Sequence, residues 1–132
     1  MNGAHPCPKE VAAVYETFAP EHRDTLQTTR GLIFEAAASD PRIGDIDEAL
    51  RWGEPSYLTS KKKTGSTIRL GVEKGSGEAA LFFNCKTTLV EEFRQTFGRD
   101  LRYSKNRAVL LEGAPEEALR HCILAALSYH LR

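Results

Sequence analysis

The chain has 132 residues, 41% of them hydrophobic, which suits a single domain with one core. Basic and acidic residues both number 18, so the net charge is zero, which argues against a protein that binds nucleic acids by general phosphate neutralisation. No apolar run reaches the roughly 20 residues that span a bilayer, and the N-terminus lacks the pattern of an export signal. We therefore expect a cytoplasmic protein without a membrane partner.

Two amphipathic helices are predicted near the N-terminus, after a flexible segment at residues 1–8. Between Lys9 and Phe18, apolar residues recur at the spacing of one helical face. Pro20 suits the first turn of a second helix, which should stop before Asp40.

The next segment predicts a short helix followed by a hairpin. Residues 45–52 have apolar side chains at helical spacing, so we expect a helix there that carries Trp52 inward and ends at Gly53. Residues 57–59 and 67–72 then read as two strands, joined by a polar turn.

Three further strands and two further helices complete the prediction. Strands are expected at 79–83, 101–103 and 107–111, with a helix between the first two that is opened by a capping box at residues 88–91 and ends near Gly98. A last helix begins at Pro115. Local hairpins without regular strand–helix alternation favour an α+β domain, a small antiparallel sheet of four to five strands backed by N- and C-terminal helices.

Charge is unevenly distributed, and polar groups gather at strand ends. Residues 1–60 carry 5 basic and 10 acidic side chains, whereas residues 61–109 carry 11 and 5. If the hairpin turn, the start of the capped helix and the last turn converge, hydroxyl and guanidinium groups would share one groove at the sheet edge. Such groups bind anions, although threonine and arginine on an open sheet face are often only solvated. The candidate ligand-binding residues are Trp52, Tyr57, Thr67, Arg69, Cys85, Thr87 and Arg107.

The cysteines and histidines carry weaker signals. Three cysteines are an odd number without zinc spacing, and the histidines are too dispersed for a metal pair, so neither metal nor cofactor is expected. Cys85 stands beside Lys86 just before the capped helix, where positive potential favours a thiolate. A thiol-dependent enzyme at Cys85 is therefore one alternative, against the simpler interpretation of a packed small residue.

Several segments resemble the YdhG-like family of bacterial domains of unknown function. The resemblance rests on Arg51–Tyr57 (RWGEPSY), Gly65–Gly71 (GSTIRLG), Leu81–Leu89 (LFFNCKTTL) and Asn106–Ala108 (NRA), and it extends from about residue 10 to the end. It implies a small α+β domain with an antiparallel sheet backed by helices. Some relatives are interpreted as frataxin-like iron chaperones, which would here use surface carboxylates of the first helices, namely Glu10, Glu16, Glu21 and Asp24.

These observations favour a non-enzymatic domain that binds a small anionic molecule at a polar groove. Iron handling through the acidic helices and thiol chemistry at Cys85 remain the alternatives. The sequence predicts no oligomeric state.

Overall fold

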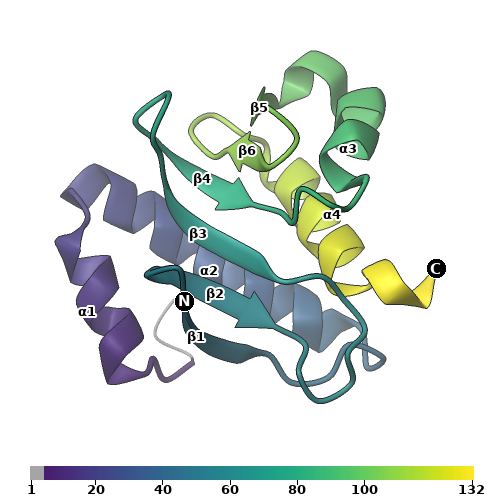
Figure 1. Cartoon of the computed structure of the whole chain (residues 1–132), viewed down its shortest axis with the longest axis horizontal. Coiled ribbons are helices and arrows are strands. Elements are labelled where there is room, and N and C mark those ends of the chain that lie inside the picture. Colours follow the sequence, from purple (N-terminus) through teal and green to yellow (C-terminus); the bar gives the residue numbers. More distant parts are fainter. Residues whose placement is uncertain (1–4) are drawn as a thin grey trace.

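Six antiparallel strands form one sheet in the order β1-β2-β3-β4-β6-β5 in the computed structural model, which describes residues 5–132 (Figure 1). The strands of this described part are β1 (Asp47–Arg51), β2 (Glu54–Leu58), β3 (Ile68–Glu73), β4 (Glu78–Phe82), β5 (Arg102–Ser104) and β6 (Ala108–Leu110). Its helices are α1 (Lys9–Thr17), α2 (Pro20–Ser39), α3 (Leu89–Phe97) and α4 (Glu116–Leu127), with 3₁₀ turns at Gly98–Asp100 and Tyr129–Leu131. The predicted α+β class is confirmed, with one strand more than expected.

The limits of four of the five predicted helices agree closely with the structure. α1 and α2 meet at Ala19-Pro20, and Pro20 occupies the first turn of α2, where its missing N–H leaves no helical hydrogen bond unmade. α3 begins after Thr88 as expected, but the capping box is not formed. The Thr88 hydroxyl donates to the Glu92 carboxylate and caps no backbone N–H.

The short helix expected at residues 45–52 is wrong, because Asp47–Arg51 is strand β1. It forms a hairpin with β2 in which Arg51 lies opposite Glu54, so Trp52 and Gly53 are the two turn residues. Both have positive φ, +57° and +75°, as in the turns that match the twist of a two-residue hairpin. Trp52 consequently projects into solvent and is 90% exposed, not buried as expected.

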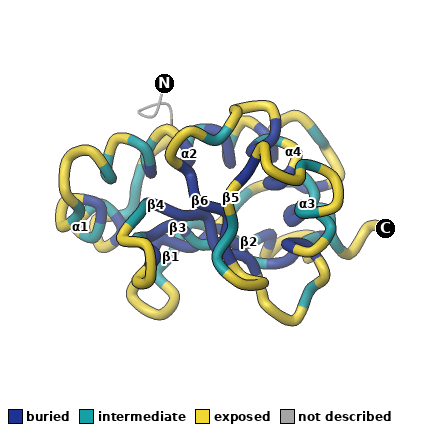
Figure 2. Tube along the Cα trace, turned by 90° about the horizontal axis from the view of Figure 1, so that it is seen from above, coloured by how far each residue is buried: buried dark blue, intermediate teal, exposed yellow. Residues whose placement is uncertain are grey.

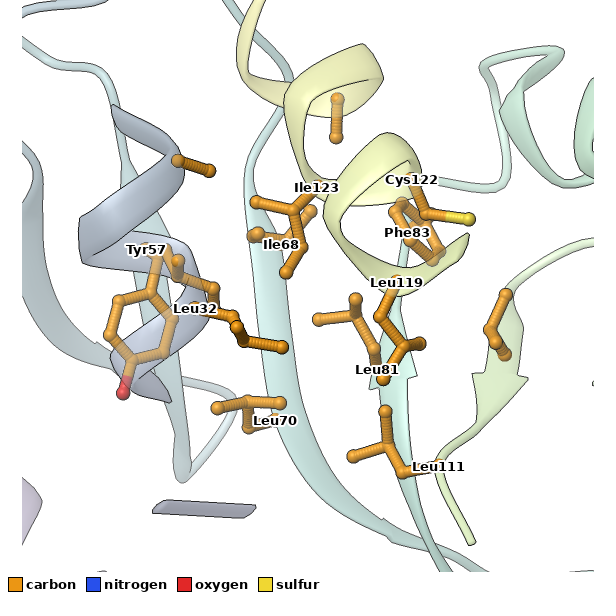
Figure 3. Packing of buried hydrophobic residues seen from close by; sticks show 14 of the residues in the cluster. Leu32, Tyr57, Ile68, Leu70, Leu81, Phe83, Leu111, Leu119, Cys122 and Ile123 are labelled. Atoms are coloured by element: carbon orange, nitrogen blue, oxygen red, sulfur yellow. The ribbon is translucent and has the colours of Figure 1, made fainter. Parts of the chain in front are cut away.

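The main core lies between the sheet and the two long helices. α2 and α4 run across one face of the sheet (Figure 1). Figure 2 shows that the buried residues are concentrated between these helices and the strands. Leu70 and Leu81 from the strands pack with Leu119 and Ile123 of α4 (Figure 3). Full burial of each such side chain stabilises the fold by about 1.5–3 kcal/mol. Cys122 also lies in this core, as its place on the apolar stripe of the last helix predicted.

The loop between β2 and β3 is fastened to the end of α4. Ser66 N donates to Ala126 O at 2.9 Å, and the Thr64 hydroxyl donates to Leu127 O at 2.9 Å. A Cβ on Gly65 would clash with the same two backbone carbonyls. This glycine therefore permits the close approach that fixes the start of β3.

The other face of the sheet is not covered by a helix within residues 5–132. Its centre holds a second, small apolar cluster of Ala80, Phe82, Ala108 and Leu110. Alternation along β3 turns Ile68 and Leu70 toward the helices, and the same alternation turns Thr67 and Arg69 to the open face. The candidate site lies on this open face.

Candidate functional site

A hollow of about 350 Å³ lies on the open face and extends from the β1–β2 turn across the sheet to the ends of β2 and β4 and the start of β3. It is lined by Arg51, Trp52, Leu58, Thr67, Arg69, Phe83, Asn84, Cys85 and Arg107. Five of the seven residues that the sequence singled out are therefore brought together: Trp52, Thr67, Arg69, Cys85 and Arg107. They come from four separate segments, so only the tertiary fold makes them neighbours.

Three guanidinium groups give the hollow its positive character. Arg69 Nη1 donates to Glu54 Oε1 at 2.6 Å, and its guanidinium carbon lies 5.4 Å from the centre of the Phe82 ring. Arg51 donates only to the neighbouring carbonyl of Leu50, and no carboxylate of the described chain pairs with Arg51 or Arg107. Two of the three positive charges are thus not neutralised locally.

The Glu54 carboxylate is the acidic partner of Arg69 on the open face. It lies above Gly71, where any Cβ would clash with it, and is half-buried between the strands. Burial raises the pKa of the Glu54 carboxyl above its usual value, while Arg69, Lys74 and Arg107 oppose that change. Its negative charge therefore offsets part of the positive charge of the hollow.

Arg107 is held in place by its backbone and by its turn. Phe83 N donates to Arg107 O at 2.7 Å, which ties the start of β6 to the end of β4. Arg94 of α3 donates to Lys105 O and, at 2.8 Å, to Asn106 Oδ1. The turn between β5 and β6 is thus fixed while the Arg107 side chain stays exposed.

Thr87 does not line the hollow, contrary to its place in the predicted groove. Its hydroxyl donates to Asn84 O at 2.7 Å and accepts from Leu89 N at 3.4 Å, so it stabilises the turn that leads into α3. Asn84 Oδ1 accepts from Lys86 N at 2.9 Å in the same turn. This turn leaves Cys85 exposed at the edge of the hollow, with a free thiol.

Tyr57 is on the opposite face of the sheet, so its expected place in the groove is wrong. Its side chain is fully buried against the helices, and its hydroxyl donates to Glu48 Oε2 at 2.7 Å. The Tyr15 hydroxyl lies 2.5 Å from that of Tyr57. Burial raises the pKa of both phenols, which therefore stay neutral and structural.

A second hollow, of about 370 Å³, lies beside this buried network. The guanidinium group of Arg30, which lines this hollow, already has protein partners, because it pairs with Glu48 and also donates to the carbonyls of His5 and Pro6. The His5 ring stacks on Phe34 with 4.2 Å between ring centres. Residues 1–4 of the segment expected to be flexible lie outside the described residues.

Sequence reasoning missed Arg51 and Asn84 in the lining and Arg30 with Glu48 in the core. Arg51 was missed because its segment was interpreted as a helix. Arg30 did carry a signal, since it lies four residues after Leu26 and three before Ile33, within the apolar stripe of α2. A charged residue at such a position indicates a buried partner.

Within residues 5–132, no three histidine, cysteine, aspartate or glutamate side chains are close enough together to hold a metal ion. The acidic residues named for the iron alternative thus form no ligand set there. In the same range, no helix combines the length and apolar character needed to cross a bilayer.

Searches against protein-family models, curated proteins and solved structures find no match to this chain, and the resemblance to the YdhG-like family stays a prediction.

Proposed function

We propose that this protein binds a small anion, without catalysing a reaction on it, in the hollow on the open face of the sheet. The observation that carries the proposal is that Arg51 and Arg107 line one hollow while no carboxylate of the described residues pairs with either. Guanidinium groups bind carboxylate and phosphate oxygens in pairs of charge-assisted hydrogen bonds. Thr67 and Asn84 add side chains that hydrogen-bond to such oxygens.

The size and lining of the hollow support a binding role. Its volume is at the lower end of the range of small-molecule sites, about 300–1,000 Å³. Among its lining residues none is a histidine or a carboxylate, so Cys85 has no adjacent general base there. This favours anion binding over thiol catalysis.

Calorimetry with sulfate and with inorganic phosphate at low ionic strength tests the proposal. Arg107→Ala and Arg51→Ala should each weaken binding about tenfold, the effect of losing one charge-assisted contact. Arg99→Ala is the matched control, since Arg99 is an exposed arginine outside the hollow with no carboxylate partner in the described chain. Equal affinities for all three variants, or no binding by the parent protein, would refute the proposal.

Alkylation of Cys85 locates the anion independently. Cys122 is buried, and burial raises the pKa of the partly buried Cys7, so Cys85 is the cysteine expected to react first. A bound anion should slow this reaction in the parent protein and in Arg99→Ala, but much less in Arg107→Ala. An unchanged rate at saturating sulfate would place the anion elsewhere.

A further inference from the structure

Trp52 is the feature of the hollow that anion binding alone does not explain. It occupies the first position of a two-residue hairpin turn, with φ at +57° and Gly53 following at +75°. Asparagine, aspartate or glycine suit this position, whereas a bulky aromatic residue is disfavoured in the left-handed region.

No contact among residues 5–132 compensates for this unfavourable conformation, as the exposure of the side chain shows. The side chain is 90% exposed and contributes nothing to either apolar cluster. In the described part of the chain, no aromatic ring stacks on the indole and no cation lies over it. A strained, exposed tryptophan at the rim of a hollow points to a role in binding.

The neighbours of Trp52 indicate what the ring would bind. Arg51 precedes it as the last residue of β1, and Arg51, Arg69 and Arg107 line the same hollow. Leu58 adds an apolar side chain to the lining, whereas the Phe83 ring is buried in the main core against Phe93. The hollow therefore offers an exposed aromatic ring at the β1–β2 turn and guanidinium groups along the sheet face.

We infer that the ligand is an anion attached to a flat aromatic ring, of the size of a mononucleotide, with its ring on Trp52 and its anionic group at the guanidinium groups that line the hollow. This inference rests on the proposed anion site and adds the class of molecule. Stacking between a base and an aromatic side chain is tolerant of ring type, so the shared chemistry is a ring joined to a phosphate or carboxylate. The small hollow and the zero net charge favour a single small molecule over a nucleic-acid strand.

Intrinsic fluorescence gives a direct readout, because Trp52 is the only tryptophan in the chain. Adenosine 5′-monophosphate should quench its emission at saturation, while ribose 5-phosphate, which has the anion without the ring, should bind with little quenching. By calorimetry, the mononucleotide should bind about tenfold more tightly than ribose 5-phosphate, the expected gain from one stacked ring. 2-Naphthoate in place of the nucleotide distinguishes a carboxylate from a phosphate as the anionic group.

Substitutions at Trp52 separate the ring contribution from the anion contribution. Trp52→Asn suits the turn and should raise the melting temperature. It should abolish the tenfold tighter binding of the mononucleotide relative to ribose 5-phosphate, while the affinity for ribose 5-phosphate itself should stay within twofold of that of the parent protein. Trp52→Phe should restore part of the advantage.

The outcomes distinguish the two proposals. Equal affinities for ribose 5-phosphate and for both ring-bearing probes would overturn the aromatic ligand and leave the anion site standing. Affinity that rises with the length of a single-stranded oligonucleotide would overturn it in favour of strand binding. If neither the parent protein nor Arg107→Ala binds any of these anions, both the anion site and the aromatic ligand are refuted.

Discussion

Arg30 and Glu48 form a two-point ion pair inside the protein, with Arg30 Nε 2.6 Å from Glu48 Oε2 and Arg30 Nη2 2.8 Å from Glu48 Oε1. Their side chains are only 5% and 4% exposed. The pair joins the middle of α2 to β1, the edge strand of the sheet. It is thus a connection between the helical layer and the hairpin that carries Trp52.

Replacing Arg30 by methionine should lower the free energy of unfolding by about 3–5 kcal/mol, because the Glu48 charge would remain buried without its partner. Urea denaturation followed by circular dichroism measures this loss. The double variant Arg30→Met/Glu48→Leu should be more stable than Arg30→Met alone, since it removes both buried charges. If the double variant is the less stable of the two, the pair is not the source of the effect.

An exposed ion pair provides the control for this prediction. Lys61 Nζ lies 2.9 Å from Asp45 Oδ2, but both side chains are largely exposed. Lys61→Met should therefore leave the urea midpoint almost unchanged.

Tyr57→Phe should destabilise the protein by about 1–3 kcal/mol, the cost of leaving buried hydrogen-bonding partners unsatisfied. Tyr57 lies between two partners, since it donates to Glu48 and contacts the Tyr15 hydroxyl. Tyr15→Phe removes only the hydroxyl at the far end of this series of hydrogen bonds, so it should lower the free energy of unfolding by less than Tyr57→Phe does. Neither substitution should change the affinity for sulfate, because both phenols lie on the helix side of the sheet; a tenfold loss in Tyr57→Phe would contradict the assigned position.

The different outcomes for Tyr57 and Arg69 show what sequence patterns can determine in a strand. Along β3 the alternation is unambiguous, because Ile68 and Leu70 are apolar while Thr67 and Arg69 are polar. In β2 the alternation is weaker, because Pro55 and Tyr57 share one face while the other face mixes the polar Glu54 and Ser56 with the apolar Leu58. A shift of one residue sends every side chain to the opposite face.

The β1–β2 hairpin was missed for a related reason. Ile46, Ala49 and Leu50 lie at spacings that suit a helical face as well as a short strand. The turn residue is tryptophan, which carries no hairpin signal of the kind that Asn-Gly gives. What selects the strand is pairing with β2 and the Arg30 contact to Glu48, which is 18 residues away in the chain.

Glu73 provides a prediction on acid stability. Its carboxylate accepts hydrogen bonds from Gly75 N at 3.1 Å and Ser76 N at 2.8 Å, which lower the pKa of Glu73 from 4.5 to about 2. The ionised form thus stabilises the fold above pH 4.5, and this contribution is lost as the pH falls toward about 2. Glu73→Gln should be less stable than the parent protein at pH 7, with a difference that shrinks below pH 4.5.

Carboxyl NMR can follow the titration of Glu73 directly in the folded protein. A midpoint near 2 is expected, and a midpoint at the usual 4.5 would contradict the role of the two backbone donors.

The last prediction concerns Glu54 and follows from the proposed anion site. Glu54 binds Arg69 at 2.6 Å and places a negative charge beside the hollow, so it competes with any anion for the same guanidinium. Glu54→Gln should therefore strengthen sulfate binding severalfold at pH 7.

The pH dependence of the parent protein should show the same competition. Burial raises the pKa of Glu54, so protons neutralise it as the pH falls, at a higher pH than for an exposed glutamate. Because sulfate does not titrate in this range, its affinity for the parent protein should rise as the pH falls from 7 toward 4.5, the usual pKa of a glutamate. In Glu54→Gln the affinity should be high and nearly constant over the same interval. Parallel pH profiles for the two proteins would show that Glu54 does not control the charge of the hollow, since the only difference between them is the group that loses its charge.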